Sequence, residues 1–480
     1  MKINNKKYEY MKSLADTAES EIEFYGCETA ELFSKEIKYS LQGVLEKSFV
    51  WNPDEPDNIN HRFVSTSVDG RVCSDHLWSR DAGVLLRELS EWGYLGHACY
   101  LTEILIDLVD KNDDGYYSYP MWFYQGQKAS GSELDGTASI IIGMALFFRK
   151  LSPNNPVYHK ILDFLTCESS PVKYLLKKLA ESPLIVGTGE FGTGTKGDGE
   201  YCNVVQNNLV CLAIESVVPI LGEQCELAAK TLRDNIAKYM IDSDGKWLWC
   251  VNHLNFKPDY DLLNDDYVVG FGGINGVMSM AADVCGFDSA RFDSRIFDAS
   301  LKTFDALFNA PLRREQYEKY GMWPQWDRKL DGLLTSPSYG QGYALQVALL
   351  LDKPDISGRL VEYLAKATYS PPEPYKIDRD NPYQFYERML SPDFNGLAEF
   401  DQGCGALNLV NVAEPLKIAR IIAGINNSGN NVQILPRLPD GWTGYTARNW
   451  LVFTDNGMKK CDIICEKTNG GYKYSMNLKK

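Results

Sequence analysis

The chain has 480 residues and a formal net charge of −15, from 64 acidic and 49 basic side chains. This acidic balance argues against a nucleic-acid partner, which would require a basic surface. No run of eighteen apolar residues is present, so we expect no transmembrane helix. The polar start MKINNKKYEYMKSLADTAES lacks the apolar middle of a signal peptide, and we therefore expect a cytoplasmic protein.

Cysteine and histidine are placed in a way that disfavours a metal site. The twelve cysteines form no paired CxxC modules, and several lie in apolar helical patterns. We therefore expect reduced, buried thiols. The five histidines are far apart in the sequence. Neither a metal nor an organic cofactor is expected.

Apolar residues at helical spacing dominate most of the chain. A helix followed by an acidic turn and then by aromatic residues recurs after positions 109 and 241, which indicates an internal repeat. About a dozen helices with such a repeat favour an all-α fold, a toroid of two concentric helix rings with a funnel at one end. The predicted helices span 30–47, 79–93, 95–111, 134–151, 202–220, 225–241, 273–286, 295–309, 338–352, 358–369 and 406–425.

The last fifty or so residues have a different character. Four short alternating segments (VQILP, ARNWLVFT, KKCDIICEK and YKYSMNL) are separated by Asn-Gly and Gly-Gly turns, a pattern typical of antiparallel strands. We therefore predict a helical barrel over 1–426 and a small antiparallel β subdomain over 427–480.

The first candidate site lies in HLWSRDAGVLLREL, where Trp78, Arg80 and Asp81 precede or open a predicted helix. Asp81 could only compensate the helix N-terminus, or pair with Arg80 as a structural ion pair. Beside a tryptophan, however, an arginine and a carboxylate can bind sugar hydroxyls while the indole stacks on a pyranose face. We favour sugar binding for these three residues.

The second candidate site is Asp135, which opens the helix of LDGTASIII. A capping role is again the simple alternative. An aromatic cluster that includes Trp122 precedes it, and this cluster could be a core plug or a sugar platform.

These two segments together resemble the glucoamylase family. The match is W-x-R-D-A followed, some fifty residues later, by L-D-G-T-A-S at the start of a helix. The resemblance implies an (α/α)6 barrel of the six-hairpin glycosidase type. It also implies that Arg80 and Asp81 hold the terminal sugar, with Trp78 nearby.

Two acidic segments carry the catalytic candidates. Glu190 and Glu200 lie in the glycine-rich loop GTGEFGTGTKGDGEY, which could equally be a flexible surface loop. The resemblance places the general acid at a glutamate on this loop, Glu190 by position, with Glu200 as the alternative. Glu200 could also be a carboxylate that compensates a helix N-terminus. GLAEFD resembles the family's second catalytic segment, which makes Glu399 the general base; Glu387 is its competitor.

Further aromatic and amide side chains could shape the pocket or could simply pack in the core. They are Trp323, Trp326, Tyr339 and Gln341, all close to predicted helix ends. A sugar site requires aromatic faces and hydrogen-bonding partners together.

The resemblance implies hydrolysis of an oligosaccharide or glycoside by an exo-acting, inverting enzyme on a gluco-configured sugar. In that mechanism two carboxylates about 6.5–9.5 Å apart protonate the leaving oxygen and activate water. A phosphorylase on the same barrel is an alternative that needs a cationic pocket, for which Arg313–Arg314 is the candidate, although we read it as a cluster at a helix C-terminus. A sugar epimerase would need paired histidines. A non-catalytic carbohydrate-binding protein is the remaining alternative.

Overall fold

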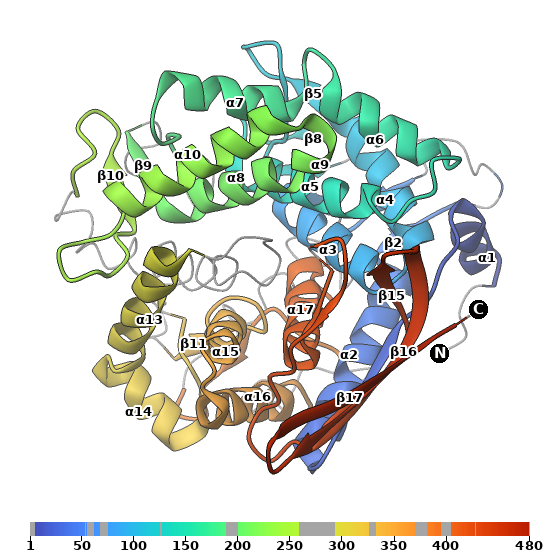
Figure 1. Cartoon of the computed structure of the whole chain (residues 1–480), viewed down its shortest axis with the longest axis vertical. Coiled ribbons are helices and arrows are strands. Elements are labelled where there is room, and N and C mark those ends of the chain that lie inside the picture. Colours follow the sequence, from blue (N-terminus) through green and yellow to red (C-terminus); the bar gives the residue numbers. More distant parts are fainter. Residues whose placement is uncertain are drawn as a thin grey trace.

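The computed structural model describes residues 5–52, 54, 62–67, 75–124, 127–188, 200–258, 293–325, 333–369, 382–394, 405–427 and 429–479. Within these ranges the helices form two concentric layers around a central axis (Figure 1). The inner helices are α3 (Ser79–Glu91), α5 (Leu134–Phe148), α8 (Val204–Ser216), α15 (Gln341–Leu350) and α17 (Leu409–Ala423). The outer helices are α2 (Glu28–Lys47), α4 (Leu95–Leu108), α6 (Pro156–Thr166), α7 (Pro171–Glu181), α10 (Glu223–Tyr239), α13 (Ser294–Phe308), α14 (Pro311–Tyr320) and α16 (Pro354–Tyr369). α1 (Asn5–Leu14) packs on α4, and the short α9 (Val218–Leu221) links α8 to α10.

The two layers follow from the distribution of apolar residues around each helix. α5 is apolar on nearly all sides, and every residue from Leu134 to Phe147 is buried. In α10 only Cys225, Ala229, Leu232 and Ile236 are buried, one stripe at helical spacing on an otherwise polar helix. A helix that is apolar all round belongs in the interior, and one with a single stripe covers the surface. The predicted helical toroid is therefore confirmed.

The predicted helices agree with the observed ones apart from their ends. The prediction over 202–220 is wrong as one helix, because α8 ends at Ser216 and Pro219 lies in the first turn of α9. Proline has no N–H to continue the α8 ladder, and its fixed φ suits a helix start. α1, α6, α7 and α14 were not predicted, and the prediction over 273–286 lies outside the described residues.

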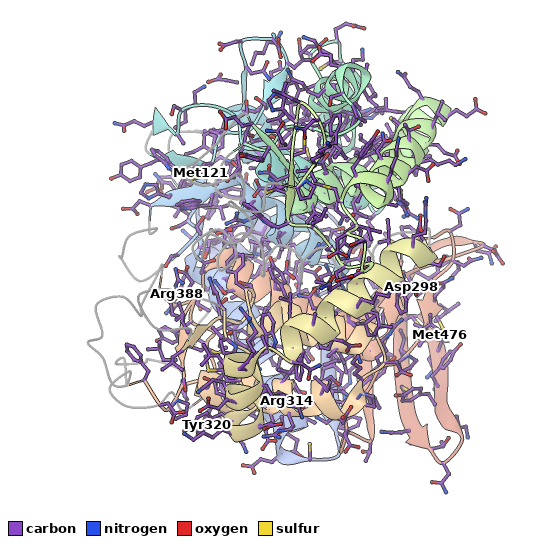
Figure 2. The ribbon with its side chains drawn as sticks, turned by 90° about the vertical axis from the view of Figure 1, so that its left-hand side faces the viewer. Met121, Asp298, Arg314, Tyr320, Arg388 and Met476 are labelled. Atoms are coloured by element: carbon purple, nitrogen blue, oxygen red, sulfur yellow. The ribbon has the colours of Figure 1, made fainter. Side chains whose placement is uncertain are left out.

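The C-terminal sheet is antiparallel, in the order β1 (Glu21–Tyr25), β15 (Gly444–Thr454), β16 (Gly457–Thr468) and β17 (Gly471–Leu478). The three C-terminal strands confirm the predicted β region, and β1 adds an N-terminal strand to it. Along β16, the side chains of Cys461, Ile463 and Cys465 alternate inward and are buried. Figure 2 shows Met476 of β17 on one side of the molecule and Met121 and Arg388 on the other.

Short strand pairs connect the helices at the ends of the toroid. The two expected acidic turns both close in this way: β5 pairs with β6, and Ile241 bridges Trp247. The short pairs are β2 (Phe49–Val50) with β3 (Phe63–Val64), β5 (Asp110–Lys111) with β6 (Tyr117–Ser118), β9 (Tyr201–Asn203) with β10 (Cys250–Asn252), β11 (Leu334–Thr335) with β12 (Met389–Leu390), β13 (Ile425–Asn426) with β14 (Gln433–Ile434), and the triplet β4 (His76–Trp78), β7 (Trp122–Tyr124) and β8 (Gln127–Lys128).

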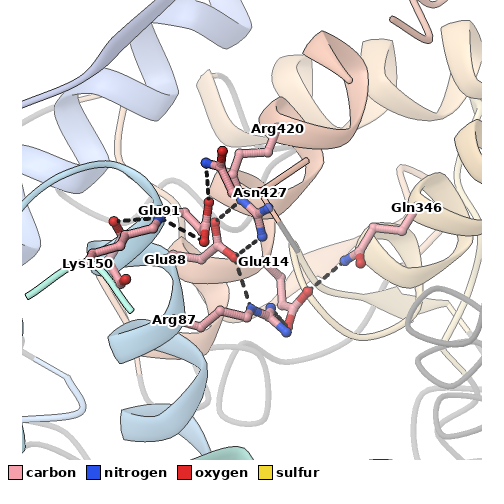
Figure 3. Close-up of polar contacts among 9 residues, drawn as sticks. Arg87, Glu88, Glu91, Lys150, Gln346, Glu414, Arg420 and Asn427 are labelled. Carbon is pink, nitrogen blue, oxygen red and sulfur yellow. Dashed lines mark hydrogen bonds and ion pairs between the residues drawn. The ribbon is translucent and has the colours of Figure 1, made fainter. Parts of the chain in front are cut away.

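A buried ionic network joins the inner helices at the C-terminal ends of α3 and α17 (Figure 3). Arg420 donates to both carboxylate oxygens of Glu88, at 2.9 and 2.7 Å, and neither side chain is more than 1% exposed. Arg87 donates to Glu88 at 3.0 Å and to Glu414 at 3.4 Å. Gln346 Nε2 donates to the other carboxylate oxygen of Glu414 at 2.7 Å. Buried charges are tolerated only when they are paired and hydrogen-bonded, as they are here.

The nine cysteines within the described ranges are all free. No group of three or more potential metal-ligating side chains is found in this part of the chain. Among the helices described, none combines the length and apolar character needed to cross a bilayer.

Candidate active site at the mouth of the toroid

The first turns of α3, α5, α8, α15 and α17 meet at one end of the toroid, which we call the mouth. Direct contacts join them in sequence around this end. Trp78 N donates to Thr66 Oγ1 at 2.8 Å, and Leu409 N at the start of α17 donates to Thr66 O at 3.0 Å. Ser338 Oγ, before α15, donates to Asn411 of α17 at 2.6 Å. The mouth is therefore built from one end of each of these inner helices.

A buried polar cluster links α3, α5 and α8 at the mouth. Arg80 Nη1 donates to Asp135 Oδ2 at 3.1 Å, and Gln206 Nε2 donates to Asp135 Oδ1 at 2.7 Å. Gln206 Oε1 in turn accepts from Thr188 N at 3.0 Å and from Asn203 Nδ2 at 2.8 Å. Asp135 and Gln206 are fully buried. The Asp135 carboxylate thus binds across helices, which goes beyond the capping role weighed from the sequence.

Close packing of α3 on α5 brings Arg80 and Asp135 together. A Cβ on Gly83 would lie 2.4 Å from the carbonyl carbon of Ser139, so only glycine permits this approach. A Cβ on Gly143, about one turn after Ser139 on α5, would meet Gly83 O at 2.8 Å. The small residues therefore set the distance between the two helices and, with it, the distance between the two charges.

Arg80 also lies beside two other predicted site residues. Its Nε is 3.9 Å from Asp81 Oδ1, which is the ion pair considered from the sequence. The guanidinium carbon is 5.6 Å from the ring centroid of Tyr339, a cation–π distance. Arg80, Asp81, Asp135 and Tyr339 are thus all brought together, from segments far apart in the sequence.

Aromatic side chains form a half-exposed surface on β4 and β7 next to Arg80. Trp78 lies opposite Trp122 and His76 opposite Tyr124 in the antiparallel register, so these four rings share one face. His76 stacks on Tyr124 at 4.5 Å and meets Trp122 edge-on at 5.1 Å. The intervening Phe123 is buried. The aromatic cluster therefore provides both a core plug and an exposed ring surface.

Two predicted pocket residues support the mouth from within the core. Trp323 is fully buried, and its backbone N–H donates to Gln341 Oε1 at 2.6 Å. Gln341 Nε2 donates to Gly321 O and Leu360 O at 3.1 and 2.7 Å. The side-chain amide of Gln341 therefore forms its hydrogen bonds to the backbone within the core. Trp326 lies outside the described residues.

Of the three catalytic candidates, Glu190 and Glu399 lie outside the described residues. Glu200 is exposed, and its carbonyl accepts from His253 N at 3.0 Å and from the imidazole Nδ1 at 2.8 Å. β9 separates Glu200 from α8, and Asn203 caps that helix by accepting from Gln206 N. Glu200 is therefore not placed at the N-terminus of α8.

The competing charged residues also have definite positions. Glu387, the competitor of Glu399, pairs with Arg388 Nε at 3.4 Å and is buried. Arg313 and Arg314 lie near the start of α14, so their assignment to a helix C-terminus was wrong. Pro311 opens this helix after Ala310. Arg313 stacks under Trp323 at 5.3 Å, and burial lowers its pKa to about 10.

Sequence reasoning missed several polar residues that face the axis of the toroid. A small cavity of about 30 Å³ is lined by Arg80 itself and by Arg87, Ser139, Tyr343 and Glu414, among others. Gln206 was missed as well. One sequence signal could have identified these residues: a charged or amide side chain within an otherwise apolar helix. Such a side chain is buried and therefore requires a hydrogen-bonding partner.

No family model and no curated protein sequence matches the chain. Two solved structures are similar in fold. A D-mannose isomerase is 12% identical, with a TM-score of 0.53 over 83% of this chain and 98% of the isomerase. A putative kojibiose phosphorylase from the human microbiome is 11% identical, with a TM-score of 0.54 over 99% of this chain. This chain spans 64% of the phosphorylase. The chain therefore shares the (α/α)6 toroid fold of these two structures, and its described residues also form a C-terminal antiparallel sheet.

Proposed function

We propose that the chain is a carbohydrate-active enzyme whose substrate binds at the mouth, and that its reaction is hydrolysis of a glycosidic bond. The observation that carries this proposal is the buried Arg80–Asp135–Gln206 cluster beside the half-exposed rings of Trp78 and Trp122. Sugar recognition combines fixed charged or amide groups, which hydrogen-bond hydroxyls, with aromatic faces that cover the apolar side of a pyranose. Both types of group meet here.

The roles within the site follow from the chemistry of each group. Arg80 offers several N–H donors in a fixed plane, and its contacts with Asp135 and Tyr339 hold that plane in one orientation. Asp81 adds a carboxylate acceptor next to it. We assign Arg80 and Asp81 to the hydroxyls of the terminal sugar, and Trp78 and Trp122 to its ring face. Asp135 and Gln206 position Arg80.

We assign general acid to Glu190 and general base to Glu399, with inversion of configuration. Thr188, two residues before Glu190, already bonds to Gln206 at the mouth. Gly405, six residues after Glu399, is followed within a few residues by Asn408, the cap of α17. The support is that both glutamates belong to segments that enter helices of the mouth. Glu200 is the weaker candidate for the acid.

Phosphorolysis is the second candidate, because the fold similarity to the kojibiose phosphorylase extends over 99% of this chain. In that reaction phosphate replaces the attacking water, and only the acid is required. The buried cation of Arg313 is one group that could attract an anion, although it lies beneath Trp323.

The test is a rate assay on a panel of aryl glycosides and natural disaccharides, with and without inorganic phosphate. We expect sugar release without phosphate, near-complete loss in Glu190→Gln and Glu399→Gln, and retention of most activity in Glu200→Gln. Full activity in Glu399→Gln would remove the base assignment. Turnover only with phosphate, releasing sugar phosphate, would favour the phosphorylase. Interconversion of free sugars without bond cleavage would favour an isomerase.

A further inference from the structure

A second cavity, of about 300 Å³, is lined by none of the residues described at the mouth. Its lining comes from α1, α2, the start of α4, and strands β1 and β15. α4 begins just after α3 ends, and the thirteen residues of α3 span roughly 20 Å at 1.5 Å per residue. The cavity is therefore separate from the site that contains Arg80. Its lining includes Lys7, Glu19, Gln42, Leu45, Tyr94 and His97.

His97 is the most informative group in this cavity. It is only 4% exposed, and Phe49 packs against its ring at 5.1 Å. Burial, with a smaller effect of nearby Lys7, lowers the pKa of His97 to about 3. The imidazole is therefore neutral near pH 7, with one nitrogen as donor and the other as acceptor. Within the described part of the chain neither ring nitrogen makes a hydrogen bond to another residue, and the ring lines the cavity.

Two more polar groups of the cavity are unpartnered within the described residues. The amide of Gln42 on α2 and the hydroxyl of Tyr94 before α4 make no hydrogen bond there, and both are half-buried. With His97 they present donors and acceptors in one partly enclosed space. Leu45 and the ring of Tyr94 supply apolar surface beside them.

The charged groups of the cavity are balanced by neighbouring charges. Glu19 pairs with Lys12 and Glu21 with Lys38, each at 3.3 Å. Lys7 donates to the backbone carbonyls of Glu46 and Phe49 at the end of α2. The remaining carboxylate of the lining, Glu46, attracts the Lys7 ammonium. The lining and these partners together carry no net charge, so they favour neither an anionic nor a cationic ligand. A neutral molecule with hydroxyl groups matches the groups that are left.

We propose that this cavity is a second binding site, for a neutral hydroxyl-rich molecule of the size of a mono- or disaccharide. Gln42 and His97 hydrogen-bond its hydroxyls, and the ring of Tyr94 covers an apolar face. A volume of about 300 Å³ lies at the lower end of the range of about 300–1,000 Å³ for small-molecule pockets. The site does not depend on the reaction proposed at the mouth, because its residues belong to other segments.

The test is calorimetric titration of the full chain with D-glucose, D-mannose and maltose as probes. Four variants are compared with the unmodified chain. His97→Phe and Gln42→Leu remove polar groups from the cavity, and Asp135→Asn alters the mouth. His159→Phe repeats the histidine substitution at an exposed position on α6. Gln42 is only half-buried, so its variant keeps the test valid if His97→Phe does not fold.

We expect a saturable sugar-binding phase that His97→Phe and Gln42→Leu each weaken about tenfold, the effect of losing roughly 1.4 kcal/mol of hydrogen bonding. Asp135→Asn and His159→Phe should leave this phase unchanged. The proposal is overturned if no sugar phase responds to the cavity variants, or if Asp135→Asn abolishes all sugar binding. Binding of putrescine in place of the sugars would also overturn it, because the ligand would then be a cation. Failure of the hydrolase proposal would leave this phase in place.

Discussion

Arg80 and Asp135 are 55 positions apart in the sequence, yet they form a 3.1 Å hydrogen-bonded ion pair between the first turns of two inner helices. Asp135 is fully buried and Arg80 is 8% exposed. Desolvating two such charges costs about as much as their attraction returns, so a pair like this is weak support for stability alone. Its place at the mouth, beside Tyr339, is better explained by the orientation it gives to Arg80.

Gly83→Ala should destabilise the protein, contrary to the usual effect of this substitution in a helix. Replacing a glycine inside a helix by alanine normally raises the free energy of unfolding by about 1 kcal/mol. Here the new Cβ would lie 2.4 Å from the Ser139 backbone, so we expect a loss of about 1–3 kcal/mol in the free energy of unfolding. Urea denaturation measures it. Gly470→Ala is the control, because a Cβ at this position would have no other atom within 4 Å. A Gly83→Ala protein as stable as the original would contradict the packing described.

Trp122→Ala should weaken substrate binding and leave the fold intact, because this ring is half-exposed on β7. Loss of one stacking face costs about 1 kcal/mol, which is roughly a fivefold rise in KM. Steady-state kinetics on the best substrate of the panel measures it. Trp51, which stacks on Tyr10 of α1 at 4.6 Å, gives the matched control, and Trp51→Ala should leave KM unchanged. Equal KM values for Trp122→Ala and the unmodified chain would exclude the ring from the site.

Arg420→Met should be among the most destabilising substitutions outside the apolar core. It leaves Glu88 buried without its two hydrogen bonds from Arg420, and breaking such a pair costs about 3–5 kcal/mol. The urea midpoint should fall accordingly. In the double variant Glu88→Leu with Arg420→Met, the free energy of unfolding should fall by less than the sum of the losses in the two single variants. The reason is that neither charge of this pair is then left buried without the other. Strict additivity would show that the two side chains are not coupled.

His97 should make stability depend on pH in one direction. Its pKa of about 3 in the folded chain lies below its ordinary value of 6.5, and burial is the main cause. Below pH 6.5 the unfolded chain binds a proton at His97 that the folded chain does not bind. The free energy of unfolding therefore falls by up to about 1.4 kcal/mol per pH unit toward pH 3. In His97→Phe this contribution should vanish. The comparison of unfolding curves from pH 7 to pH 4 tests it, and parallel pH profiles for both proteins would show that His97 is not buried in this way.

Most of the helical layers could be predicted from apolar spacing, because each layer buries a different share of its helix surface. α6 and α7 were missed although Asn155 and Ser170 cap them and proline opens each. This is a recognised start signal, which outweighs a weak apolar stripe. β1 could not be inferred, because its partner β15 lies more than 400 residues further along the chain. The residue pattern of a short segment does not indicate a pairing with a strand so distant in the sequence.

The candidate site was only partly predictable for a related reason. Arg80, Asp81 and Asp135 were identified because charged residues at the starts of apolar helices stand out in the sequence. The position of Tyr339 over Arg80 depends on how the helices close into a ring. Gln206 and Glu414 were missed because a single polar residue in a buried helix does not reveal its partner.

The most direct test of the mouth as the sugar site is the rate of sugar release by Asp135→Asn compared with the unmodified chain, on the same glycoside without phosphate. The substitution keeps the shape of the side chain but removes the charge that holds Arg80. We predict that kcat/KM falls about 10- to 100-fold, the equivalent of 1.5–3 kcal/mol for a hydrogen bond to a charged group, with an unchanged circular dichroism spectrum. Equal kcat/KM values for the two proteins would contradict the account, because the reaction would then take place elsewhere.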